Sequence, residues 1–142
     1  MACPYFYPEE KWKGKLAGRA PQFPLGDFYE GACRAGDAEF RPDWDTLRER
    51  CNMGYARCQC PRFPENAGPD AVRFTIVQDR EAAIALYYVI EKNHAPYQHG
   101  PLEYDRATGA LRATPANAAL GNQARAYVES YLRRILARAA TA

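Results

Sequence analysis

The stretch VRFTIVQDREAAIALYYVIEK, residues 72–92, decides the fold class of this 142-residue chain. Its first part places Val72, Phe74 and Ile76 on one side and polar residues opposite, which is the two-residue period of a half-buried strand. Its second part, AIALYYVIEK, is rich in branched and aromatic residues, which favour a strand. A polar turn separates the two parts. The stretch therefore predicts two consecutive strands of one antiparallel sheet.

The residues after this stretch predict the rest of that half of the chain. LEYDRATGALRAT (102–114) indicates a hairpin, with Gly109 suited to a left-handed turn position. Toward the end of the chain, apolar residues recur at spacings of three and four, which is the pattern of an amphipathic helix. We expect Thr114 to cap this helix, with Pro115 at its first position.

The first half of the chain has a different character. All five cysteines lie in the first 60 residues. Prolines and glycines interrupt every short apolar run up to residue 41, so we expect little regular structure there. One short helix is predicted to begin after Asp43, a suitable N-cap, and to stop at Gly54. On this helix Trp44, Leu47 and Cys51 would share the buried face.

Together these patterns predict an α+β fold in a single domain, residues 1–142. A cysteine-rich, metal- or cluster-binding half (1–69) meets a sheet-plus-helix half (70–142) at the turn-rich segment 61–70. The predicted elements are four strands at about 71–78, 83–92, 101–105 and 110–114, a long helix at about 115–139 and a short helix at about 43–52.

Composition narrows the classes of function. The net charge of +2 is too small to indicate binding to nucleic acid or to an anionic membrane. No window has the uninterrupted apolar length of a membrane span, and the first residues lack the order of a secretory signal, so we expect a cytoplasmic protein. In that reducing compartment, clustered cysteines more often bind metal or carry out redox chemistry than form disulfides. A redox or protein partner fits this interpretation, and the sequence does not indicate an oligomeric state.

The cysteines form the main candidate site. We interpret Cys3, Cys33, Cys51 and Cys60 as ligands of one [4Fe-4S] cluster, because such a cluster gathers four thiolates and these four come from four separate segments. Cys3 and Cys60 are each followed by proline, as is the last ligand of bacterial ferredoxin motifs, although the rest of that spacing is absent. Cys58 is an alternative ligand, because two cysteines one residue apart bind the same ion only with strain.

Arginines lie within two positions of most of the thiols, where positive charge lowers a thiol pKa and offsets the charge of thiolate ligands. Those that we assign to the site, as residues that neutralise charge and tune a potential, are Arg34, Arg57 and Arg62, while Arg50 also adjoins a cysteine. Gly31 and Gly36 lie on either side of Cys33 and would let backbone N–H groups face an anion.

Three alternatives remain open. A zinc site would use the same cysteines, although the paired C-x2-C or C-x4-C ligands typical of zinc knuckles are absent. Cys58 and Cys60 could form a redox dithiol, but the thioredoxin-like C-x-x-C arrangement is missing. The cysteines could also be small buried side chains with a packing role. His94 and His99, in a Pro/Gly-rich connection, are weaker candidates for metal binding or proton transfer.

The sequence thus favours a small cytoplasmic metal-centre protein with an electron-transfer, redox-sensing or structural role. The competing hypothesis is a non-catalytic protein-interaction module that structural zinc or packing alone stabilises. The sequence does not assign an enzymatic reaction, because it lacks a phosphate-cradling glycine loop, a nucleophile elbow and an H-E-x-x-H helix.

Overall fold

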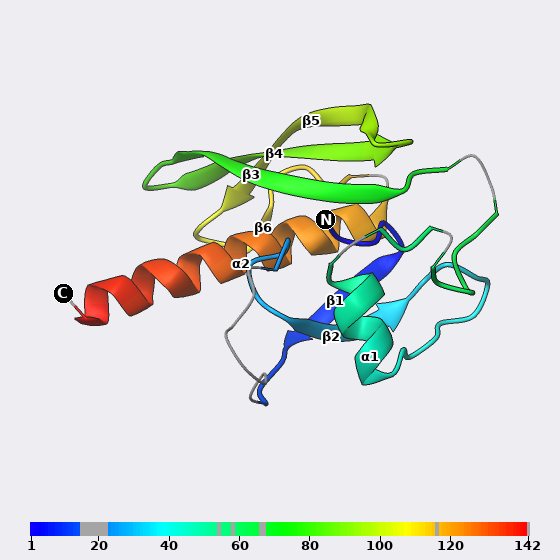
Figure 1. Ribbon diagram of the computed structural model, residues 1–142. Helices are drawn as coiled ribbons and strands as arrows, with labels where there is room; N and C mark the ends of the chain where they lie inside the picture. The colour runs from blue at the N-terminus through cyan, green and yellow to red at the C-terminus, as the bar shows by residue number, and fades with distance from the viewer. Residues whose placement is uncertain (15–22, 54, 58, 66–67, 116, 142) are drawn as a thin grey trace.

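A four-stranded antiparallel sheet and one long helix organise the fold (Figure 1). The computed structural model describes residues 1–14, 23–53, 55–57, 59–65, 68–115 and 117–141. The strands pair in the order β3-β4-β5-β6. The bounds are β3 (Ala71–Asp79), β4 (Ala83–Lys92), β5 (Ala95–Asp105), β6 (Ala110–Leu111) and the helix α2 (Ala118–Thr141). This is the α+β class that the sequence predicts.

The alternation predicted for the first two strands of this sheet is confirmed. Val72 and Phe74 of β3, and Ile84 and Leu86 of β4, are buried and belong to the hydrophobic core. The buried face of the sheet packs on α2, where the ring of Phe74 stacks on that of Tyr127 with 5.6 Å between the centroids. Apolar burial of this kind is the main source of stability for a sheet covered by a helix.

The third strand begins earlier than predicted, at Ala95 rather than 101, and the fourth ends at Leu111 rather than 114. Asn93 and His94 connect β4 to β5 in a two-residue turn, and their φ angles of 53° and 61° match a type I′ hairpin. The sequence did not indicate this turn because it lacks the glycine that usually marks one. The turn at Gly109, with φ of 69°, is as predicted.

The helix α2 begins at Ala118 rather than at 115, so the expected cap at Thr114 and first turn at Pro115 are wrong. Asn117 takes the capping position instead. Its side-chain oxygen accepts hydrogen bonds from two backbone N–H groups of the first turn, at 2.9 and 3.2 Å. Among the described residues, no helix combines the length and the apolar character that crossing a bilayer requires.

We expect Asn117→Ala to lower the free energy of unfolding by about 1 kcal/mol, because it removes both capping hydrogen bonds. Thr114→Ala should change the same quantity by less than about 0.5 kcal/mol. Urea titrations of the two variants make this comparison, and equal losses would contradict the assignment of the cap to Asn117.

The N-terminal half contains regular structure that the sequence did not predict. β1 (Phe6–Lys11) and β2 (Tyr29–Cys33) form an antiparallel ribbon. Pro8 lies inside β1 and the register shifts just after it, which breaks the two-residue period. Gly31 lets the two strands approach, because a Cβ there would lie 2.1 Å from the Tyr7 carbonyl oxygen. The expectation of an irregular N-terminal half is therefore wrong for these two segments.

The predicted short helix is present as α1 (Trp44–Thr46) followed by a π-helical turn, η1 (Leu47–Cys51). Asp43 caps it as predicted, because its carboxylate accepts a backbone N–H of the first turn at 2.9 Å. Both end residues of η1 are buried, but Trp44 is 38% exposed and does not share that face. Gly54, the predicted stop, lies outside the described residues.

The helix α2 lies between the four-stranded sheet and the β1–β2 ribbon (Figure 1). On its ribbon side, the side-chain amide of Asn122 donates a hydrogen bond to the Pro8 carbonyl. The N-terminal segment reaches the sheet, because Ala2 and Val72 exchange two backbone hydrogen bonds of 2.9 Å at the edge of β3. This segment therefore carries Cys3 from the sheet edge toward the ribbon, across one end of the core.

Candidate metal centre

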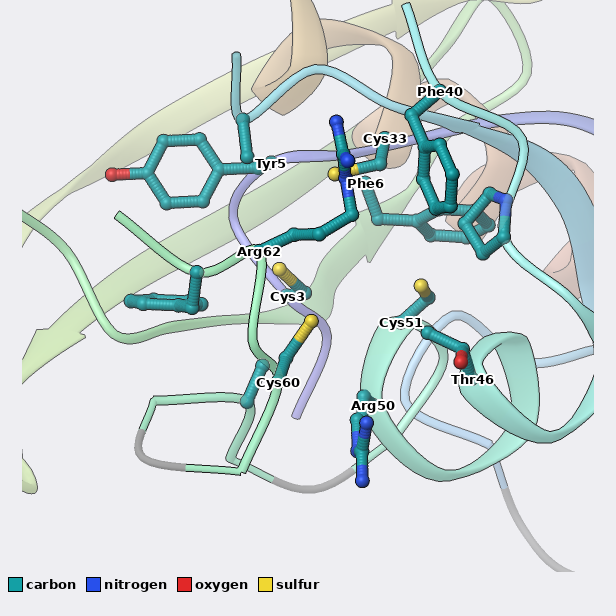
Figure 2. A pocket seen from close by; sticks show the side chains of 14 residues that line it. Cys3, Tyr5, Phe6, Cys33, Phe40, Thr46, Arg50, Cys51, Cys60 and Arg62 are labelled. Carbon is teal, nitrogen blue, oxygen red and sulfur yellow. The ribbon is translucent and has the colours of Figure 1, made fainter. Parts of the chain in front are cut away.

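Four cysteines from separate segments line one hollow (Figure 2). They are Cys3, Cys33, Cys51 and Cys60, which carry free thiols. Figure 2 shows their sulfur atoms turned toward a common space between the N-terminal segment, β2, η1 and the loop before β3. The same hollow is otherwise lined mainly by apolar and aromatic side chains. Cys58, the alternative ligand, lies outside the described residues.

Backbone hydrogen bonds fix the positions of these cysteines relative to one another. The N–H of Cys3 donates to the carbonyl of Cys51 at 3.1 Å, which joins two of the four directly. Cys33 and Phe40 exchange a pair of hydrogen bonds, at 2.7 and 3.1 Å, that folds the loop after β2 back over the hollow. The N–H of Cys60 donates to the carbonyl of Ala56 at 2.8 Å. These bonds position the backbone segments that carry the four thiols.

Gln123 of α2 holds the segment that carries Cys3. Its side chain is fully buried, and its amide nitrogen donates to the carbonyls of Cys3 and Phe6 at 2.8 and 2.7 Å. These two residues are the ends of one tight turn, which a backbone hydrogen bond of 3.1 Å closes. No pattern in the sequence indicates this role, because Gln123 lies within a helical pattern and 120 residues from Cys3.

Asn52 connects the segments that carry Cys51 and Cys33. The residue is fully buried and its side chain makes three hydrogen bonds to the backbone. Its oxygen accepts the Tyr29 N–H at 3.0 Å, and its nitrogen donates to the carbonyls of Tyr29 and Leu47, both at 2.9 Å. One side chain therefore ties η1 to the start of β2.

The four thiols differ in burial. Cys3 and Cys51 are buried, whereas Cys33 and Cys60 are partly exposed. The pKa of Cys3 is raised to about 12, mainly by burial and also by the neighbouring Cys33 and Cys60, while two backbone hydrogen bonds lower it. Burial also raises the pKa of Cys51, and the other three thiols raise it by smaller amounts. Burial thus disfavours the thiolate forms of Cys3 and Cys51, and a cation bound beside them would offset that penalty.

Arg50 and Arg62 are the charged residues in the lining of this hollow. The guanidinium of Arg62 lies 3.8 Å from the ring centroid of Phe40 and extends beside the thiols (Figure 2). Of the three arginines assigned from the sequence, the structure brings only Arg62 to the site. Arg34 lies 3.6 Å over the ring of Tyr7 and faces a glutamate.

Arg57 has a partner elsewhere. It forms an ion pair with the carboxylate of Asp70, which is 3% exposed, and its guanidinium lies 4.7 Å over the ring of Phe63. Asp70 also accepts the backbone N–H of Asn93 at 2.7 Å. These contacts hold the loop that carries Cys60 against the β4–β5 hairpin, so Arg57 supports the site from outside its lining.

The remaining candidates from the sequence lie apart from the thiols. His94 is in the β4–β5 turn, stacked on Tyr55 with 4.3 Å between ring centroids. His99 lies within β5 and pairs with the hydroxyl of Tyr87. The expected place after a strand is therefore correct for His94 but wrong for His99, and neither histidine lines the hollow. Gly31 lies in β2, where it allows close strand packing, so it does not supply the expected anion nest.

A single metal ion and a cluster require different arrangements of ligands. Among the described residues, no three His, Cys, Asp or Glu side chains converge closely enough to hold one metal ion. In a four-iron cluster each thiolate binds a different iron, so its ligands surround a volume instead of meeting at a point. The hollow has about 370 Å³ of empty space, its open mouth included.

Comparisons with known proteins returned no match among family models, curated proteins or solved structures. The fold and the site by themselves define an α+β protein with four thiols around one apolar hollow beside two arginines. Thiols are the usual ligands of iron–sulfur clusters, and thiols that lie near one another can also be oxidised.

Proposed function

We propose that the chain is a metal-centre protein in which Cys3, Cys33, Cys51 and Cys60 hold one [4Fe-4S] cluster. The observation that carries this proposal is the convergence of these four cysteines, from four segments of the chain, on one apolar hollow. Thiolate ligands are the usual ligands of such clusters, and the apolar surroundings would limit access of water and oxidants.

The cluster would supply one-electron chemistry when bound, and four thiolates would leave no iron open to a substrate. The role is accordingly electron transfer, redox sensing or structural support, in the cytoplasm. The chain's own contribution is to gather the thiols, to exclude water with Phe6, Phe40 and Phe63, and to balance negative charge with Arg50 and Arg62.

Purification without oxygen from cells that assemble iron–sulfur clusters tests the proposal. We expect a brown protein with broad visible absorption that dithionite bleaches, and about four irons and four sulfides per chain. A colourless, iron-free protein would refute the proposal. Stoichiometric zinc in place of iron would instead support the alternative, a non-catalytic interaction module that structural zinc stabilises.

A further inference from the structure

The hollow opens on the side of two of its four cysteines. Cys3 and Cys51 are buried beneath the N-terminal segment and η1, whereas Cys33 and Cys60 are partly exposed. Arg62 and Phe40 lie on this exposed side, stacked on each other, and Phe40 is 37% exposed. Figure 2 shows the side chain of Arg62 running from the Cys60 loop toward Cys33. This side is therefore where another molecule can come closest to the thiols.

The charge at this mouth is positive. Among the described residues, the lining contains Arg50 and Arg62 and no acidic side chain. The positive charges of two other arginines nearby are balanced by acidic residues, because Arg34 faces Glu39 and Arg41 pairs with Glu9.

Arg62 carries the uncompensated charge. Arg50 has an acid close by, because it contributes to the lowered pKa of Asp43. The side-chain and then the backbone hydrogen bond from Thr46 lower that pKa more strongly. Arg62 has no ion-pair partner within the described part of the chain, and its contact is with an aromatic ring.

We infer that this mouth is the docking point for an acidic one-electron carrier protein, whose carboxylates pair with Arg62 while Phe40 packs against its surface. The inference rests on the proposed function. In the exchange, one electron passes between the site and the carrier past Cys33 and Cys60, and no bond or proton moves. Opposite charges would raise the rate of encounter and fix its orientation.

The first test uses metal-free protein with Cys58→Ser, so that this thiol does not react. A thiolate at the mouth attacks an aromatic disulfide, forms a mixed disulfide and releases one thiolate of the reagent. We compare the rate for dianionic dithionitrobenzoate with that for neutral dithiodipyridine. Arg62→Gln should lower the ratio of the two rates by about fivefold at low salt, and less at high salt.

Arg34→Gln is the matched control, because Arg34 follows Cys33 in the chain but lies outside the lining and faces Glu39. Its ratio should stay close to that of the unmodified protein. Equal effects of the two substitutions, or no effect of Arg62→Gln, would overturn the inference.

The second test uses the loaded protein after reduction, with one anionic and one cationic oxidant. We expect electron transfer to ferricyanide to be favoured over transfer to tris(phenanthroline)cobalt(III), and Arg62→Gln to lower this preference by about fivefold. If the loaded protein shows no preference between the two oxidants, the docking inference is wrong but the proposed function is unaffected. A protein that never binds iron would refute the proposed function and, with it, the electron carrier.

Discussion

Replacement of any one of Cys3, Cys33, Cys51 and Cys60 by serine is expected to remove most of the visible absorption of the protein purified without oxygen. Iron per chain should fall by at least about tenfold, because loss of a direct ligand should cost at least as much as loss of a residue that only supports one. Cys58→Ser should keep both the absorption and the iron. The measurements are the visible spectrum and the iron and sulfide content of each variant.

The far-ultraviolet circular dichroism of each metal-free variant serves as the control. It should match that of the unmodified metal-free protein, because backbone hydrogen bonds and apolar packing hold the cysteines in place. Absorption lost with Cys58→Ser but kept with Cys60→Ser would contradict our choice of ligands. A variant of Cys3 or Cys51 that keeps its full iron content would show that the buried thiols have a packing role.

Asn52→Ala is expected to lower the free energy of unfolding of the metal-free protein by about 3 kcal/mol. The side chain is fully buried, and its removal leaves the N–H of Tyr29 and two carbonyls without their partner. A buried polar group that loses its partner costs about 1–3 kcal/mol, and the rearranged backbone recovers part of the sum. Urea denaturation followed by circular dichroism gives the value.

Gln98→Ala in β5 is the matched control, because Gln98 is an exposed amide on the sheet. Its effect should be within about 0.5 kcal/mol of zero. Since Asn52 joins η1 to β2, its loss should also make the cluster less stable in air, as two ligand-bearing segments become free to separate. A loss below about 1 kcal/mol would contradict the role that we assign to this residue.

The elements with long periodic patterns were predictable, and the short ones were not. β3, β4 and α2 each repeat their pattern of apolar and polar residues many times, so a few residues that depart from it do not hide it. β1 was missed because Pro8 and a register shift interrupt its alternation within six residues. The start of α2 was misplaced because Thr114 and Pro115 suit a helix start as well as Asn117 does, and tertiary packing decides between them.

The candidate site was predictable in its thiols but not in its surroundings. The four chosen cysteines lie in different segments, and the fold brings them to one hollow; that they bind a cluster stays a prediction. Two of the three arginines that we assigned from their nearness to cysteines in the sequence do not line the hollow. A residue next to a cysteine in the chain can point away from the thiol, as Arg34 does beside Cys33. Asn52 and Gln123 had no sequence signal, since their partners are backbone groups of distant segments.

The hydrogen bonds from Gln123 to the turn of Cys3 also set an order of events during synthesis. Cys3 is made well before Gln123, which follows it by 120 residues. Until residue 123 has emerged, the turn of Cys3 lacks the two hydrogen bonds from Gln123 and is held by the bonds of the N-terminal segment to Cys51 and Val72. Long-range closure of this kind is slow and comes late in folding. Insertion of a cluster would therefore follow translation, and Cys3 would be the last of the four thiols to reach its place.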